Sequence, residues 1–178
     1  MRPLKVLHIA NRGEKKQSRQ FYSFQHKVNN GLVRNGHNVL WFSDRDIARG
    51  LNPLRSQKLG KKACNRELID VSGHFKPDVM LLSHADLISA ETISTIRTHN
   101  PSLRVAQYNI DGLITRNNLN KIHSKAEVVD FTFMTTAGEA LKRAAGNGSG
   151  AAFIPNPVDP SVEINKAYLS DHLPIDVF

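Results

Sequence analysis

Short apolar blocks alternate along the chain with longer stretches of helical character, and this alternation constrains the fold more than any other feature. Strands that read as continuous apolar runs are typical of parallel sheets, because crossover helices cover both faces of such sheets. The order therefore predicts an α/β fold, a doubly wound Rossmann-like parallel sheet of about six strands with helices on both faces. The expected strands are residues 4–10, 39–42, 78–83, 104–108, 130–134 and 151–154.

Helices are expected between these strands. Apolar side chains at spacings of three, four, four and one form one stripe from Phe21 to Val33, with Ser18 as the expected N-cap and Gly36 at the C-terminal end. The polar, Arg-rich segment 44–56 is expected to be a loop. Further helices are expected at 57–75, 90–99 (capped by Ser89) and 138–145.

Composition excludes several classes of protein. A single cysteine, Cys64, rules out a disulfide framework. The longest stretch without charge, 144–158, contains three Gly and two Pro and is shorter than the roughly 20 apolar residues of a membrane span. The first eight residues are too polar for the apolar region of a signal peptide. We therefore expect a cytoplasmic protein.

The charge is distributed unevenly. Residues 1–76 contain 16 Lys and Arg against 5 Asp and Glu, whereas residues 77–178 contain 8 against 11, within a total of +8. A basic half attracts anions such as phosphates, anionic lipid headgroups or nucleic acid. The alternative, which the charge alone leaves open, is a solvated face that serves solubility.

Polar residues follow the predicted strands, at the sheet edge where open parallel sheets bind ligands. Asp111 lies on a tight turn after the fourth strand, where a carboxylate can take a proton from an attacking hydroxyl. His84, after the third strand, is a second candidate base or a group that holds a hydroxyl. The alternatives are a turn aspartate bonded to its own backbone and a structural loop histidine.

The loop 11–19 lies between the first strand and the first helix, where backbone N–H groups and the helix dipole attract anions. Its single glycine excludes the dinucleotide-binding fingerprint, and the absence of Gly-Lys-Ser/Thr excludes a P-loop. What remains is a cationic loop that grips a phosphate-bearing ligand, or one that is merely solvated. The expected acceptor- or phosphate-binding residues are Asn11, Arg12, Gly13, Lys15, Lys16 and Arg19.

Metal binding has little support. Asp44, Arg45 and Asp46 have the spacing of the metal-binding acidic triplet of GT-A glycosyltransferases, but Asp44 capping a turn while Asp46 faces water explains the same residues. The eight histidines are scattered and show no metal-ligand spacing. We expect no metal and no resident cofactor.

Three segments together resemble the N-terminal domain of GT-B glycosyltransferases. Residues 5–9, followed by a loop and a helix that ends in 31–39 (Gly-Leu-Val-Arg-Asn-Gly-His-Asn-Val), resemble the opening of that family. Residues 75–82 resemble the entry to its third strand, and 153–160 resemble the Ile-Pro-Asn-Gly-Val-Asp motif that closes its N-terminal domain. Pro157 replaces the usual glycine of that motif. The Asp111 turn and the final segment also resemble the spore-maturation-protein-like branch of glycosyltransferases.

The resemblance implies two Rossmann-like domains facing each other across a cleft. Residues 1–160 would be the acceptor-binding domain, and 161–178 the linker and the start of a C-terminal domain that binds the nucleotide-sugar co-substrate. It implies sugar transfer to an acceptor hydroxyl, with Asp111 or His84 as general base if the configuration inverts. The basic half then fits an anionic envelope glycolipid or polysaccharide, with peripheral contact at the inner face of the membrane. The expected cleft and hinge residues are Asn156, Pro157 and Asp159.

A stand-alone, non-catalytic binding module with a flavodoxin-like fold is the alternative function. Its ligand would be phosphorylated or a polyanion, which the basic surface also fits. Nucleic acid is not expected, because no helix is continuously basic and no aromatic platform is interleaved with cations.

Overall fold

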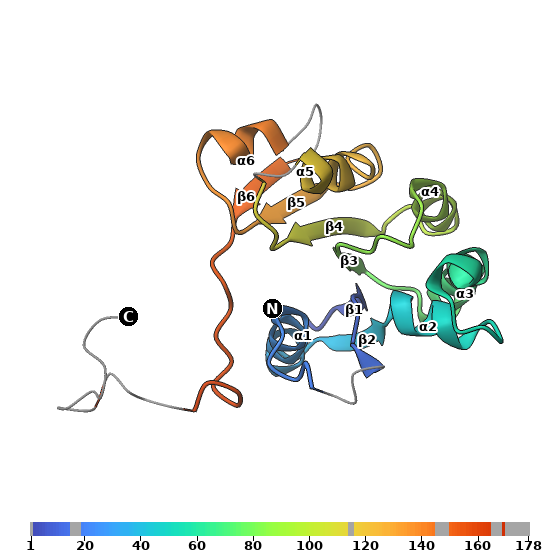
Figure 1. The fold of residues 1–178 in the computed structure, drawn as a ribbon, viewed down its shortest axis with the longest axis horizontal. Helices are drawn as coiled ribbons and strands as arrows, with labels where there is room; N and C mark the ends of the chain where they lie inside the picture. Colours follow the sequence, from blue (N-terminus) through green and yellow to red (C-terminus); the bar gives the residue numbers. More distant parts are fainter. Residues whose placement is uncertain (1, 15–18, 114–115, 145–149, 165–168, 170–178) are drawn as a thin grey trace.

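The structure, a computed structural model, describes residues 2–14, 19–113, 116–144, 150–164 and 169 (Figure 1). One six-stranded sheet forms the centre, all its strands run parallel, and their order is β2-β1-β3-β4-β5-β6. The predicted α/β class and all six strands are confirmed, and no strand boundary is shifted by more than one residue. The strands are β1 (Lys5–Ile9), β2 (Asn38–Phe42), β3 (Val79–Ser83), β4 (Arg104–Asn109), β5 (Phe131–Met134) and β6 (Gly150–Phe153).

The strand order fixes where a ligand can enter. From β1 the chain crosses to β2 on one side, then returns past β1 to β3 on the other. The loops that leave β1 and β3 therefore diverge, and the crevice that opens at the carboxyl ends of these strands is the usual ligand site of such sheets.

Helices cover the two faces of the sheet (Figure 1). On one face α2 (Asp44–Gly50), α3 (Gln57–Phe75) and α4 (Ala90–His99) bury an apolar cluster that includes Leu7, Ile9, Met80 and Leu82. His8 lies between two of these residues and points to the other face, because side chains alternate along a strand. There its ring lies 3.4 Å from the side chain of Asn29 in α1 (Phe24–Arg34).

Two more helices complete the far half of the sheet. In the smaller apolar cluster, Ile122 of α5 (Arg116–His123) packs with Met134 of β5, and Leu141 of α6 (Glu139–Ala144) packs against them. Within the described part of the chain, no helix has both the length and the apolar character that crossing a bilayer requires.

The helix predictions were right in part. The predicted helices at 57–75, 90–99 and 138–145 are confirmed as α3, α4 and α6, and the Ser89 side chain caps α4 by accepting the N–H of Thr92 at 3.1 Å. The first helix begins later than predicted, at Phe24 with Ser23 in the N-cap position, and Ser18 lies outside the described residues.

The prediction of a loop over 44–56 was wrong, because residues 44–50 form α2. The short segment offers only Ile47 and Ala48 as apolar residues, so it shows no periodicity. Two aspartates in its first turn and Arg49 in its last turn complement the helix dipole. The helix α5 was missed for a similar reason, since Leu119 and Ile122 are its only large apolar residues.

Candidate functional site

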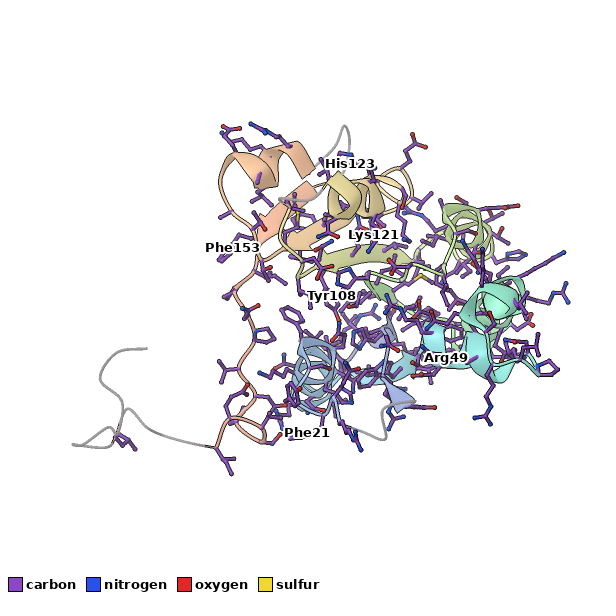
Figure 2. The ribbon with its side chains drawn as sticks, in the orientation of Figure 1. Phe21, Arg49, Tyr108, Lys121, His123 and Phe153 are labelled. Atoms are coloured by element: carbon purple, nitrogen blue, oxygen red, sulfur yellow. The ribbon has the colours of Figure 1, made fainter. Side chains whose placement is uncertain are left out.

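A cavity of about 340 Å³ opens at the carboxyl ends of β1, β2, β3 and β4. Its walls come from the loops after these strands, from the segment before α1 and the first turn of α1, and from α5, whose Lys121 is labelled in Figure 2. Of the residues predicted as sites, Asn11, His84 and Asp111 meet here. The lining residues are Asn11, Gln20, Gln25, Asp44, Arg45, Ser83, His84, Asp86, Ile110, Asp111 and Lys121.

Among the described residues, three oxygen atoms of this cavity are buried without a hydrogen-bond partner: Asn11 Oδ1, Asp44 Oδ2 and Asp86 Oδ1. A buried acceptor without a partner costs roughly 1–3 kcal/mol, and more when it is charged, so such atoms are rare in folded proteins. They come from the segments that follow three different strands, β1, β2 and β3, and line one cavity. The arrangement fits a ligand that donates hydrogen bonds, such as a group bearing several hydroxyls.

Asp44 is the most deeply buried of the three, with 1% of its surface exposed. Burial raises the pKa of its carboxyl to about 6, and the nearby Arg45 guanidinium opposes this rise. At neutral pH the carboxyl is therefore mostly ionised, and one of its oxygens has no hydrogen-bond partner within the described part of the chain. A ligand hydroxyl placed there would form a charge-assisted hydrogen bond, which is among the stronger kinds.

Arg45, one of the two cations that line the cavity, is engaged by the protein, and so is Lys125, which lies outside the lining. Arg45 donates to Asp86 Oδ2 at 2.6 Å, which leaves only the other oxygen of that carboxylate unpartnered. Lys125 is buried beneath the loop and donates to the backbone carbonyl of His84 at 3.3 Å. Burial lowers the pKa of Lys125, and the Asp86 carboxylate opposes this shift. These contacts hold the loop after β3 in place.

His84 and Asp111 form the reactive pair of the cavity. His84 Nδ1 lies 3.9 Å from Asp111 Oδ2, and burial lowers the pKa of the imidazole although the Asp111 carboxylate opposes this shift. The imidazole is therefore neutral at pH 7 and can accept a proton. The turn after β4 is closed by Asn109, whose Oδ1 accepts the N–H of Asp111 at 2.7 Å, so the turn does not consume the Asp111 carboxylate.

The backbone at His84 is unusual. His84 and Ala85 have φ angles of 54° and 45°, in the left-handed region that non-glycine residues seldom adopt. Two such residues in succession store strain of about 1–3 kcal/mol each, and strain of this kind clusters at ligand sites. The turn places the His84 side chain in the cavity instead of along the strand.

The cationic loop after β1 is arranged differently from the prediction. Its backbone N–H groups at Gly13 and Glu14 donate to one carboxylate oxygen of Asp46, at 3.1 and 3.2 Å, so they are not free for an anion. The Arg12 guanidinium lies over the ring of Trp41, 5.7 Å from its centroid. Arg19 is exposed, and Lys15 and Lys16 lie outside the described residues. Phosphate binding by these side chains stays a prediction.

The Asp46 carboxylate therefore holds the loop after β1 against the first turn of α2. It also accepts hydrogen bonds from the Ser43 hydroxyl at 2.6 Å and from Arg49 at 2.9 Å. The two aspartates thus differ sharply. Both oxygens of the Asp46 carboxylate accept hydrogen bonds, whereas Asp44 Oδ2 has no partner among the described residues.

The predicted cleft and hinge residues do not line the cavity. After β6 the chain runs back beside α1 (Figure 1), where the buried Asp159 carboxylate accepts from Asn30 at 2.7 Å and from Arg34 at 2.6 Å. These bonds, that from Asn30 foremost, hold the pKa of Asp159 well below its usual range. Asn156 is exposed and Pro157 is half-buried, and both lie in the segment that precedes the hydrogen-bonded Asp159. Their role as a hinge stays a prediction.

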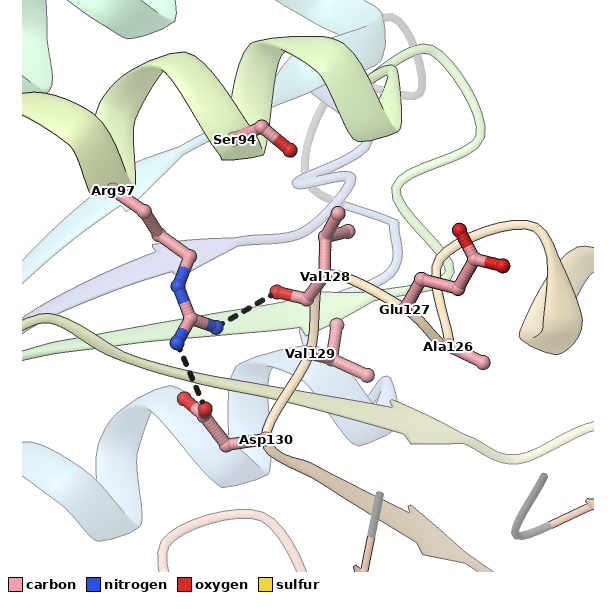
Figure 3. A pocket seen from close by; sticks show the side chains of 7 residues that line it. All are labelled: Ser94, Arg97, Ala126, Glu127, Val128, Val129 and Asp130. Atoms are coloured by element: carbon pink, nitrogen blue, oxygen red, sulfur yellow. Dashed lines mark hydrogen bonds and ion pairs between the residues drawn. The ribbon is translucent and has the colours of Figure 1, made fainter. Parts of the chain in front are cut away.

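A larger cavity of about 490 Å³ lies at the opposite edge of the sheet, beside the start of β5 (Figure 3). Arg97 spans it, donating to the Val128 carbonyl and to Asp130, both at 3.0 Å. The other Asp130 oxygen accepts the N–H of Val105. Because these polar groups bond to one another, this cavity has the character of a structural junction.

Sequence reasoning missed several residues of the site. Asp86 lies three residues beyond the end of β3, Lys121 belongs to the unpredicted helix α5, and Gln20 and Gln25 were assigned to the first helix. The only available signal was the acidic residue of the Ser83–Asp86 loop.

No protein-family model and no curated protein matches the chain.

Proposed function

We propose that this chain is the acceptor-binding domain of a glycosyltransferase, which presents an acceptor hydroxyl to a nucleotide-sugar. The observation that carries the proposal is that three oxygens in one strand-end cavity, Asn11 Oδ1, Asp44 Oδ2 and Asp86 Oδ1, have no partner among the residues that the structure describes. A sugar of the acceptor offers several hydroxyl donors on a small rigid ring, which can satisfy acceptors contributed by separate segments of the chain. The resemblance of 5–9, 75–82 and 153–160 to GT-B enzymes supports the same conclusion.

The neighbouring imidazole supplies the chemistry. In an inverting transfer, neutral His84 removes the proton from the acceptor hydroxyl, the oxygen attacks the anomeric carbon, and the bond to the diphosphate breaks as the nucleoside diphosphate leaves. The Asp111 carboxylate, 3.9 Å from His84, stabilises the imidazolium that forms. We assign His84 as the base and Asp111 as the positioning residue.

The acceptor class follows from the charges around the cavity. Asp44, Asp86 and Asp111 outnumber Arg45 and Lys121 among its lining residues, which suits an uncharged sugar ring better than a phosphate. The basic surface of residues 1–76 suits the anionic remainder of an envelope glycolipid or polysaccharide. In this proposal the nucleotide-sugar is held by a second domain, as the resemblance implies.

The test is release of nucleoside diphosphate by the native gene product. A panel of nucleotide-sugars is offered together with envelope lipid and polysaccharide fractions of the source cell. We expect His84→Gln to lower kcat about 10²- to 10⁴-fold with KM little changed. Asp111→Asn should lower kcat less and move the acidic limb of the pH profile. His74→Gln, an exposed histidine of α3, is the matched control.

Two results would overturn parts of this proposal. Full transfer by both cavity variants would remove His84 and Asp111 from the chemistry. Binding of glycosides to the cavity with no diphosphate released from any donor would favour the non-catalytic binding module.

A further inference from the structure

The turn between α2 and α3, together with the first two turns of α3, exposes leucines among cations. Leu51, Leu54 and Leu59 have 45%, 78% and 61% of their surface exposed, and Arg55, Lys58 and Lys62 are exposed beside them. We call these six residues the basic leucine patch. Among the described residues, none of its three cations makes an ion pair.

The turn is held rigidly in this outward-facing form. Asn52 donates to the carbonyls of Ala48 and Ser56, at 2.6 and 2.8 Å, and its Oδ1 accepts the N–H of Ser56 at 3.0 Å. The Ser56 side chain accepts the N–H of Leu59 and begins α3. These hydrogen bonds fix the backbone of the turn that carries the exposed Leu54. Little conformational entropy is therefore lost when a partner covers this side chain.

We propose that the basic leucine patch docks the protein onto an anionic lipid bilayer. Apolar side chains that enter the interface and cations that meet anionic headgroups are the two components of peripheral membrane binding, and this patch holds both on neighbouring turns. A nucleic acid or a soluble polyanion would use the cations and gain nothing from three exposed leucines. The leucines therefore favour the bilayer.

The patch lies near the cavity. α2 begins at Asp44, which lines the cavity, and ends at Gly50, so its seven residues separate the two by about 10 Å. An acceptor carried by a lipid would reach the cavity from a docked protein. The membrane inference does not depend on sugar transfer, since it concerns different residues and a different readout.

Vesicle sedimentation tests the inference. The probes are phosphatidylcholine vesicles with and without one third phosphatidylglycerol. Each cation near the surface adds about fivefold to partitioning, so Arg55→Gln/Lys58→Gln/Lys62→Gln should lose about a hundredfold on anionic vesicles. Leu54→Asn/Leu59→Asn should lose about tenfold or more of the partitioning onto vesicles. This variant should also lose the partitioning of wild type that remains in 0.5 M salt, because burial of apolar surface does not depend on charge. Arg104→Gln and Val33→Asn, exposed residues elsewhere, are the controls.

Three outcomes would overturn it. Equal partitioning onto neutral and anionic vesicles would remove the cations from the interaction. Unchanged partitioning of the leucine variant would remove the leucines. Tighter binding to a single-stranded oligonucleotide than to vesicles, unaffected by the leucine changes, would make the patch a polyanion site. All substituted residues are exposed, so the variants should fold, and thermal unfolding checks this.

Discussion

Replacing Asp44 with asparagine should make the protein more stable at neutral pH. The reason is that folded wild type buries a carboxylate of which one oxygen has no hydrogen-bond partner among the described residues. Burial raises the pKa of Asp44 from 3.8 to about 6, so the folded protein holds the proton more tightly than the unfolded chain between these values. Stability contributed by this group therefore falls as pH rises. Integrated between pH 4 and pH 8, the loss is about 2 kcal/mol.

Urea unfolding of wild type and Asp44→Asn at pH 4, 5, 6, 7 and 8 measures this loss. The free energy of unfolding of the variant minus that of wild type should increase by about 2 kcal/mol across the series, with most of the change below pH 6 and little above pH 7. The difference removes the titration of all other groups. A difference that is flat, or that falls with pH, would refute the reasoning.

Asp46→Asn is the matched control two residues away. Its carboxylate accepts hydrogen bonds from the backbone amides of Gly13 and Glu14 and from the side chains of Ser43 and Arg49. The substitution should therefore lower the free energy of unfolding by about 2 kcal/mol at pH 7. Opposite signs for two aspartates in one helical turn would show that partners, and not charge alone, decide the outcome.

Three other outcomes follow from the structure. Gly60→Ala should cost about 1–3 kcal/mol because its Cβ would strike the Ala48 carbonyl, whereas Gly73→Ala, in the same helix with open space, should gain about 0.5–1 kcal/mol; urea unfolding of both decides. Asp159→Asn should release the segment 159–163 from α1, seen as faster amide hydrogen exchange there with no change in β1. Burial lowers the pKa of His8 to about 4, so its imidazole should stay neutral in NMR spectra down to about pH 5, and an imidazole charged at pH 6 would contradict its burial against Tyr108.

The sheet could be predicted from the sequence because its signals are local. Each strand has a short segment rich in apolar residues, and residues such as Ser89 and Pro77 mark element boundaries by backbone chemistry alone. The helix α2 could not be predicted in this way. It is stabilised by packing of Ala48 and by the carbonyl of Asp44, which accepts from the Cys64 thiol of α3 at 3.3 Å, and these contacts are distant in sequence.

The site was only partly predictable for the same reason. The strand-end rule predicted that Asn11, His84 and Asp111 lie at one edge of the sheet. It could not show that Asp46 would occupy the amides of the cationic loop, or that Asp44 would lack a partner for one oxygen. Hydrogen-bond satisfaction depends on the positions of several loops at once, which local patterns do not encode.

The most direct test of the account is a nitrogen-15 NMR titration of the protein with a panel of methyl glycosides and, separately, with inorganic phosphate. If the cavity binds acceptor sugars, at least one glycoside should shift the amide signals of Asn11, Asp44 and Asp86 together, and Asp44→Asn should weaken that binding about tenfold. Phosphate should leave these signals unchanged. Shifts produced by phosphate and by no glycoside would contradict the central claim and identify the cavity as an anion site.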